Sequence, residues 1–480
     1  MTTLPTVDPI ADYRPLGDGH DEMMTTGGEI REHWSGLIRE YQTLGAGELT
    51  RRHGEIQRLL QQDGVTYNVG GNVGGNVGGS DVGGNDVGGS VGGSDDGRPD
   101  RPWTLDPIPL VLSNDEWNGI ERGMIQRAEL LDLVLTDLYG ERRLLRNRII
   151  PPEMILSDPQ FLRACDRITV PGDRQLIVFG ADIARAADGT WLTLGHRTEA
   201  PSGAAYALEN RRVLSRVFPH IFRQTGVQAL APFVQAMRSA LLSATPIGVD
   251  DPSIVVLSPG SLSETAFEHA SFAAQLGYPL VQGSDFELRH GRVGLRTVSG
   301  WVPVHVILRR VDAGFCDPLA LRSDSTLGVP GLLQAIRAGN VLVANTPGSD
   351  FLESPALLGF LPALARHLLG EELKLPALST WWCGERSAME EVLPQLAQCA
   401  IKPTYPGSVH HGNFESVLGR DLSAREVDEW AGRIARQGDD HTIQAYLPLA
   451  QMPTWQHDAS GRTRGGRIVP RSFMLRVFAL

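Results

Sequence analysis

The sequence HVILRRVDAGFCDPLALRSDSTLGVPG, residues 305–331, predicts a strand that ends at a ligand site. Its first residues are apolar and partly β-branched, as in a buried strand, and Arg309, Arg310 and Asp312 follow directly before a polar loop. In open α/β sheets, ligands bind in the crevice beyond the carboxyl ends of the strands. Two adjacent arginines at such a place favour an anionic ligand. The alternative is a structural ion pair between Arg310 and Asp312.

The residues around this strand predict an alternation of strands and helices. From Ile254 the pattern is strand, polar loop, helix, strand and then a hairpin that turns at His290-Gly291 before the arginine strand. This order resembles a small Rossmann-like layer. Because similar patterns continue on both sides, we expect an α+β (mixed α/β) protein.

The size and charge of the chain narrow its class. A chain of 480 residues exceeds what one hydrophobic core usually serves, so about three domains are expected. A net charge of -12 argues against nonspecific binding of nucleic acid, which relies on clustered lysine and arginine.

The sequence also indicates where the protein resides. No apolar run approaches the roughly 20 residues that span a bilayer, and the N-terminus lacks the basic and apolar parts of a secretion signal. Cys165, Cys316, Cys383 and Cys399 show neither paired nor metal-type spacing. We therefore predict a cytoplasmic protein with reduced thiols and no membrane association.

Residues 69–97 consist of NVGG and DVGG units that cannot build a core. Such tracts stay flexible, because ordering them costs much entropy and little apolar area offsets that cost. A phosphate-binding loop would need a strand before the glycines and a helix after them, whereas this repeat runs on to Arg98. The segment is predicted to be a solvent-exposed insertion without chemistry.

Helical patterns lie on both sides of this insertion. Apolar residues between Gly28 and Gln62 recur at helical spacing and predict two amphipathic helices. After the insertion, Ser113 or Asn114 can cap a long helix whose first turn contains Glu116.

Residues 175–198 predict a β-hairpin, because Asp188-Gly189 between two apolar runs is a strong turn signal. If these two residues form the loop, Asp182 lies opposite Gly195. Side chains alternate along strands, so Arg197 then lies on the same face and diagonally close to Asp182.

Six blocks in this order resemble a known family: RPWTLDPIP, APSGAAYALENR, SPGSLSETAFEH, LRRVDAGFCDPLALRSDSTLGVPGL, LPALSTWWCG and CAIKP. Together they resemble the circularly permuted type 2 ATP-grasp proteins, distant relatives of glutathionylspermidine synthase. The resemblance implies a circularly permuted ATP-grasp fold with a Rossmann-like pre-ATP-grasp layer. It also implies a nucleotide held between two small lobes, and the joining of a carboxylate to an amine with ATP and Mg²⁺.

The resemblance divides the chain into five expected regions. These are an N-terminal helical region (1–66), the glycine-rich insertion (67–100), a permuted ATP-grasp lobe with the PSG turn (101–245), a Rossmann-like substrate domain (246–395) and an incomplete lobe that carries the lysine (396–480).

The resemblance implies roles for residues near the nucleotide. Lys402 in CAIKP matches a strand lysine that holds phosphates, and Arg476 in LRVFAL matches an arginine directed toward them. Gln444 lies in the segment that would meet the adenine through backbone hydrogen bonds.

The resemblance also implies substrate-binding residues. Arg309, Arg310 and Asp312 match an Arg-Arg-x-Asp that binds a substrate carboxylate or acyl phosphate. Weaker candidates, for which a packing or capping role is the alternative, are His269, Glu264 and Asn345.

The chain departs from the family at the expected metal site. Close relatives carry an acidic residue, a spacer and an asparagine before the PSG turn, where this chain has Gly195, His196 and Arg197. Asp182 is the one metal ligand that the pattern retains. We hypothesise that the Arg197 guanidinium pairs with Asp182 and occupies the space of a metal. Alternatively, Arg197 points outward into solvent.

Two further departures concern the last part of the chain. The loop TYPGSVHHG after Lys402 is poorer in glycine than in most relatives, and the family pattern runs past LRVFAL into a glycine-rich segment and an α-helical domain. We therefore expect a fragment, or a subunit that a helical domain or partner completes, with low stability or association in isolation.

Three functions are compatible with the sequence. The first is an ATP-dependent carboxylate–amine ligase that acts through an acyl phosphate, and the second is a noncatalytic ATP-grasp-like binding or assembly module with a degenerate metal site. The third, a nucleotide-sugar transferase that uses SPGSLSE as a phosphate loop, leaves CAIKP unexplained.

Overall fold

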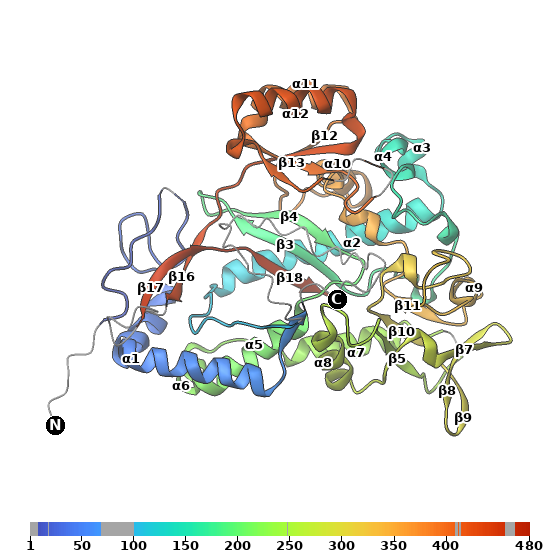
Figure 1. The fold of residues 1–480 in the computed structure, drawn as a ribbon, viewed down its shortest axis with the longest axis horizontal. Helices are drawn as coiled ribbons and strands as arrows, with labels where there is room; N and C mark the ends of the chain where they lie inside the picture. Colours follow the sequence, from blue (N-terminus) through green and yellow to red (C-terminus); the bar gives the residue numbers. More distant parts are fainter. Residues whose placement is uncertain are drawn as a thin grey trace.

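The computed structural model confirms the α+β class (Figure 1). It describes residues 8–17, 19–68, 100–246, 248–408, 411, 414–456 and 466–480. Nearly all of the predicted glycine-rich insertion, residues 69–99, lies outside the described residues, and so do four residues of the loop after Lys402. No helix in the described ranges is long and apolar enough to cross a membrane.

A three-stranded antiparallel sheet, here called the central sheet, lies in the middle of the molecule in the order β18-β3-β4 (Figure 1). Its strands are β3 (Phe179–Arg185), β4 (Trp191–Arg197) and β18 (Leu475–Ala479). Apolar residues on one face of β3 join the main core, where α2 (Asn114–Tyr139) packs. Of the two predicted caps, Ser113 is the N-cap of this helix, and its side chain forms a capping box with Glu116.

The turn between β3 and β4 differs from the predicted two-residue loop. Ala186 N–H bonds to Thr190 O, so three residues form the loop, and Gly189 has φ 90°. This arrangement would shift the register by one residue, but a bulge between Asp182 and Ile183 shifts it back. Asp182 therefore lies opposite Gly195, as predicted.

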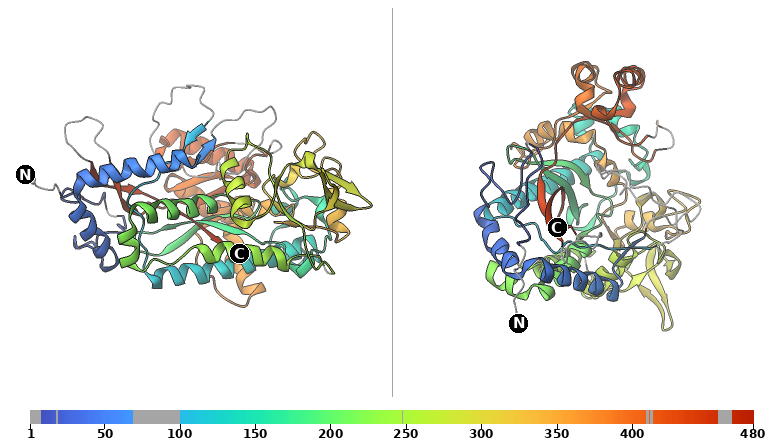
Figure 2. Two further views of the ribbon diagram at one scale, coloured as in Figure 1. Left: turned by 90° about the horizontal axis from the view of Figure 1, so that it is seen from below. Right: turned by 60° about the vertical axis from the view of Figure 1, so that its left-hand side comes forward.

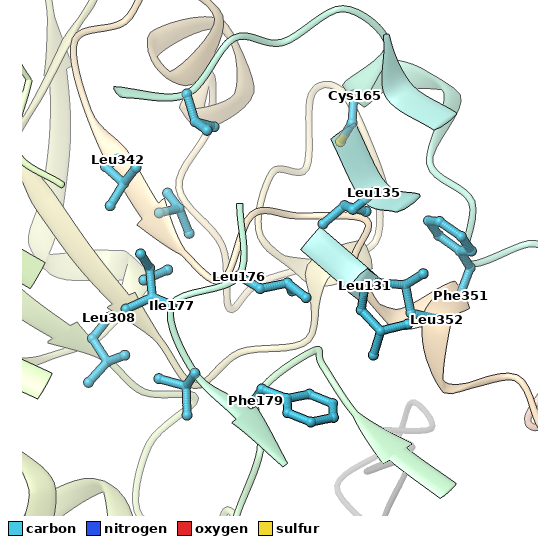
Figure 3. Packing of buried hydrophobic residues seen from close by; sticks show 14 of the residues in the cluster. Leu131, Leu135, Cys165, Leu176, Ile177, Phe179, Leu308, Leu342, Phe351 and Leu352 are labelled. Carbon is cyan, nitrogen blue, oxygen red and sulfur yellow. The ribbon is translucent and has the colours of Figure 1, made fainter. Parts of the chain in front are cut away.

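The predicted Rossmann-like layer is a four-stranded parallel sheet in the order β11-β10-β5-β6. Figure 3 shows its Leu308 and Leu342 near Ile177, in the same core as Leu131 of α2. This sheet and the central sheet therefore share one hydrophobic core. The elements are β5 (Ile254–Leu257), α8 (Ala266–Leu276), β6 (Leu280–Val281), β10 (Val306–Arg309), α9 (Leu332–Arg337) and β11 (Leu342–Ala344).

A three-stranded antiparallel sheet projects from this layer (Figure 1). It comprises β7 (Phe286–Arg289), β8 (Arg292–Thr297) and β9 (Gly300–Pro303), and β7 turns into β8 at His290-Gly291, as predicted.

A second four-stranded sheet, in the order β12-β15-β13-β14, carries Lys402. Two helices, α11 and α12, cover its outer face in Figure 1, and Ile401, Ile434 and Ile443 form the core between them. This unit is here called the lysine lobe. Its elements are β12 (Thr380–Trp382), α11 (Arg386–Val392), β13 (Cys399–Pro403), β14 (Val417–Leu418), α12 (Ala424–Arg436) and β15 (His441–Ala445).

The N-terminal region packs along one side of the molecule (Figure 2). Here α1 (Glu32–Gln62) is broken at Gly45, where φ is 73°, which confirms the two predicted helices. The remaining elements are β1 (Thr66–Asn68), β2 (Asp100–Pro102), α3 (Arg143–Arg146), α4 (Pro152–Leu156), α5 (Ala204–Val217), α6 (Pro219–Thr225), α7 (Ala231–Ser243), α10 (Leu357–Leu368), β16 (Gln451–Gln456) and β17 (Arg467–Ser472). The five region boundaries expected from the sequence stay a prediction.

Candidate functional site

A cleft lies between the lysine lobe and the central sheet. Side chains alternate along β13 and β15, so Ile401 and Ile443 pack against α12. Their neighbours Ala400, Lys402 and Gln444 face the opposite way, toward the hairpin of β3 and β4. We call the pocket between the two sheets, which is lined mainly by aliphatic residues, the apolar end of the cleft. The neighbouring group of charged side chains, which does not line that pocket, is here called the charged end.

The apolar end of the cleft is a pocket between the two sheets. Gln444 reaches across it, since its Nε2 donates hydrogen bonds to Leu194 O at 3.4 Å and to Thr380 Oγ1 at 3.2 Å. The backbone contact that Gln444 is predicted to make with adenine stays a prediction. The pocket is lined by Leu194, Leu378, Ala400, Leu418, Gln444, Ala445, Tyr446, Leu447, Leu449 and Ser472.

The charged end of the cleft is centred on Asp182 of β3. Arg476 of β18 forms a two-pronged contact with this carboxylate, with Nε at 2.7 Å from Oδ1 and Nη2 at 3.2 Å from Oδ2. Arg197 Nη2 donates to Oδ2 at 3.0 Å. The predicted Asp182–Arg197 pair is confirmed, and the alternative in which Arg197 points into solvent is wrong.

A second carboxylate fixes Arg197 from the other side. Its Nη1 lies 3.5 Å from Glu353 Oε2, and Glu353 Oε1 accepts hydrogen bonds from the amides of Thr198 and Glu199 at 2.7 and 2.8 Å. The guanidinium of Arg197 is therefore held between two carboxylates, and the side chain is only 11% exposed.

The charges at this end act on one another through low-dielectric surroundings. Burial opposes ionisation of Asp182, but Arg197 and Arg476 outweigh it and hold the pKa of this carboxyl below its usual value. Burial and the positive charge of Arg197 lower the pKa of Lys402 to about 8, although Asp182 acts in the opposite direction. Lys402 therefore faces the Asp182–Arg197 pair across the cleft and is mostly charged at neutral pH.

Arg309 lies at the end of β10, as predicted, but only 1% of the residue is exposed, and its guanidinium makes four contacts within the chain. Its Nη1 lies 3.3 Å from Glu199 Oε1 and 2.9 Å from Val311 O, its Nη2 donates to Glu199 O at 3.0 Å, and its Nε donates to Asn345 O at 3.2 Å. These contacts tie the backbone before the PSG turn to the Rossmann-like layer.

Arg310 is held in the same way. It does not pair with Asp312 in the structural ion pair considered above; its Nη2 lies 3.2 Å from Glu268 Oε2, and its Nη1 donates to Pro201 O at 2.9 Å. The other oxygen of Glu268 accepts from the amides of Gly203 and Ala205 at the start of α5. Arg310 and Glu268 thus fix the PSG turn and the first turn of α5.

The weaker candidates lie apart from the charged end of the cleft. Asn345 is buried, and its amide bonds to the backbone of Ile177, Val178 and Thr198. His269 is buried between the hydroxyls of Ser258 and Thr265, and burial holds its pKa well below the usual value. For both, the structure favours the packing alternative. Two partly exposed carboxylates complete the set, Glu264, which accepts from Tyr67 OH at 3.3 Å, and Asp312 at the start of the loop after β10.

The sequence reasoning missed three carboxylates that organise the site: Glu199, Glu268 and Glu353. Each pairs with an arginine that is distant in sequence, by 110 residues for Glu199 and by 42 for Glu268. Sequence spacing carries no signal for such pairs. The block SPGSLSETAFEH drew attention to the helix of Glu268 but not to this residue.

The side chains around Asp182 do not fit a magnesium ion. Mg²⁺ requires near-octahedral oxygen ligands, commonly one or two carboxylates with phosphates and waters. Both oxygens of Asp182 already accept from guanidinium groups, and the opposite residue is Gly195. Within the part of the chain that the structure describes, no three His, Cys, Asp or Glu side chains are grouped to hold a metal ion.

The sequence of this chain is similar to those of known proteins. The family model described as circularly permuted ATP-grasp type 2 matches residues 109–480. An uncharacterised protein of Mycobacterium tuberculosis (strain H37Rv) is 38% identical over 418 residues, which are 87% of this chain and 45% of that protein. An uncharacterised protein of Synechocystis sp. is 30% identical over 442 residues, which are 92% of this chain and 86% of that protein.

Among solved structures, a glutathione synthetase-like effector from Globodera pallida in its apo form is similar, with a TM-score of 0.51. The match covers 90% of this chain and 88% of that chain at 10% identity, so it supports the fold alone. This chain spans less than half the length of the first curated relatives that it matches.

Proposed function

Because the chain belongs to the circularly permuted ATP-grasp type 2 family, we propose that it binds ATP in the cleft between the lysine lobe and the central sheet. The family suggests ATP-dependent ligase activity in general. We propose more specifically that the whole protein transfers the γ-phosphate of ATP to a carboxylate, which releases ADP. An amine then attacks the acyl phosphate, so that a C–N bond forms and phosphate leaves.

The observation that carries this proposal is the convergence of three cationic side chains on one end of the cleft. Lys402 approaches from the lysine lobe, while Arg197 and Arg476 approach from the central sheet. Phosphoryl transfer depends mainly on positioning and on neutralising negative charge, which such groups provide. The apolar pocket at the other end would take the base.

For Arg309 and Arg310 we propose a positioning role rather than direct contact with the substrate. Both guanidinium groups are bound to Glu199, Glu268 and backbone carbonyls. They would hold the PSG turn beneath Arg476, whose Nη1 donates to Ser202 O at 3.2 Å. Of the three predicted substrate residues, the partly exposed Asp312 remains our candidate for substrate contact.

ATP-grasp proteins generally bind ATP together with Mg²⁺, which neutralises phosphate charge when bound. Asp182 is the ligand that the family pattern predicts, but its donor set does not fit the ion. We therefore assign no step to a metal at Asp182. The cationic groups of this chain would bind and orient the phosphates.

The affinity for ATP is expected to fall as the pH rises through about 8. Lys402 is charged below its pKa of about 8 and neutral above it, so its attraction for phosphate is present at pH 7 and lost at higher pH. The loss should be about tenfold in Kd between pH 7 and 9.5, as for one charge-assisted hydrogen bond. Calorimetric titration with ATP measures it. In Lys402→Arg the charge persists, so its affinity should stay flat over this range, and equal profiles of the two proteins would contradict the role of Lys402.

The contacts that Asp182 makes with two arginines favour a second function. Because its oxygens are occupied by Arg197 and Arg476, a nucleotide-binding or assembly module without turnover is the alternative to the ligase. Incubation of the full-length protein with ATP, candidate amino acids and amines separates the two, since the ligase releases phosphate when both substrates are present and the module does not. The family match also includes CAIKP, which the transferase alternative leaves unexplained.

Our proposal also covers the substrates, a partner and the location of the protein. We propose small-molecule carboxylate and amine substrates, and a helical domain or subunit as a completing partner. We also propose the cytoplasm as its location, because Cys165, Cys316, Cys383 and Cys399 are buried free thiols.

A further inference from the structure

The position where a second metal ligand would lie contains an arginine side chain. Opposite Asp182 stands Gly195, which offers no ligand, and Arg197 reaches the same carboxylate from the next residue on that face. Arg476 occupies the other side of Asp182. A divalent cation bound to this carboxylate would stand directly beside two guanidinium groups, which repel it.

Arg197 cannot easily move aside to admit a metal. It is held between Asp182 and Glu353, and Glu353 is itself fixed by two backbone amides of the chain leading to the PSG turn. Its side chain is largely buried, so leaving this position would remove the cation from Glu353 and leave Asp182 paired with Arg476 alone.

The net charge at this end of the cleft suits a polyanion. Three cationic side chains, Arg197, Arg476 and Lys402, face two carboxylates, Asp182 and Glu353. Burial also raises the pKa of Glu353, which weakens the negative side further. A triphosphate without metal carries two more negative charges than its Mg²⁺ complex and therefore matches this excess of positive charge better.

We infer that the cleft binds the polyphosphate of a nucleotide in its metal-free form, with the Arg197 guanidinium in the place of a divalent cation. This inference rests on the proposed nucleotide-binding function. It specifies the form of the ligand and the residue that selects it. Arg476 and Lys402 complete the set of cations around the phosphates.

The test compares the affinity of the full chain for ATP in EDTA and in excess Mg²⁺ by calorimetry. We expect ATP to bind in EDTA at least as tightly as in Mg²⁺, and Arg197→Ala to weaken the binding in EDTA by about tenfold. Arg366→Ala, which removes an exposed arginine paired with Glu372, is the matched control and should leave both affinities unchanged.

A variant with restored metal-binding oxygens provides a second test. In Gly195→Glu/Arg197→Asn the oxygens absent from this chain are restored, and a Cβ at Gly195 would meet no atom within 4 Å. This variant should bind Mn²⁺, seen by electron paramagnetic resonance, and should bind ATP more tightly with Mg²⁺ than in EDTA. In the unaltered chain, Asp182 should contribute nothing to Mn²⁺ binding, so the unaltered chain and Asp182→Asn should give the same Mn²⁺ signal.

The outcomes separate the inference from the function on which it rests. Binding of ATP by the unaltered chain only when Mg²⁺ is present would overturn the inference and leave the proposed function in place. Absence of binding under both conditions would overturn the two together. Thermal unfolding of each variant shows whether it is folded, and a folded Arg197→Ala that binds ATP in EDTA like the unaltered chain would also overturn the inference.

Discussion

Lys402→Met should weaken ATP binding by about 10- to 100-fold while leaving the fold intact. The side chain lies on β13 and faces the Asp182–Arg197 pair, so its ammonium would reach the phosphates as a point charge. A charge-assisted hydrogen bond is worth about 1.5–3 kcal/mol, and 1.4 kcal/mol is a factor of ten in Kd. Calorimetric titration with ATP measures the loss.

The stability of this variant should change in the opposite direction to its affinity. Burial and Arg197 disfavour the charged lysine in the folded chain, so methionine should keep or raise the midpoint of thermal unfolding. Lysine occurs at two positions only, and the other, Lys374, is half-exposed beside Glu371. Lys374→Met is therefore the matched control. A Lys402→Met protein that binds ATP like the unaltered chain would refute the assignment of the cleft.

Arg309→Ala should produce the largest loss of stability, about 3–5 kcal/mol. The substitution leaves Glu199 as a buried carboxylate without its cation and removes the donors to Val311 O and Asn345 O. Arg309→Lys should recover only part of the loss, because an ammonium cannot reproduce the planar fork. Denaturant unfolding monitored by circular dichroism gives the midpoints.

The control for this prediction is again Arg366→Ala. Its pair with Glu372 is exposed on both sides, so its loss should cost below about 1 kcal/mol. The sequence predicted that Arg309 contacts the substrate, whereas the structure supports a positioning role. Unfolding and binding measurements distinguish these two roles. An Arg309→Ala protein with an unchanged unfolding midpoint and a weakened affinity for carboxylate substrates would favour direct contact with the substrate over the positioning role.

Local sequence signals predicted the elements of this fold well. The capping box at Ser113, the strand that ends at Arg309 and the turn at His290-Gly291 are all set by residues a few positions apart. The β3–β4 hairpin shows a limit of such signals. The loop is one residue longer than predicted, and the register of Asp182 is restored by a bulge that leaves Leu194 unpaired and that the turn signal does not predict.

The candidate site was predictable only in part. The pair of Asp182 and Arg197 followed from the period of a strand, since both residues belong to one hairpin. The partners of Arg309 and Arg310 did not, because Glu199 and Glu268 meet them through the packing of separate sheets and helices. The adjacent arginines at the end of the strand were predicted to bind an anionic ligand, whereas in the structure they bind carboxylates of the chain itself.

Protection of Lys402 from an amine-reactive label by ATP tests the central claim most directly. With lysine at two positions only, peptide mass spectrometry reads Lys402 and Lys374 separately in one sample, and the lowered pKa of Lys402 makes its amine reactive near pH 8. Saturating ATP should suppress the labelling of Lys402 and leave that of Lys374 unchanged. Equal labelling of Lys402 with and without ATP would contradict a nucleotide site in this cleft.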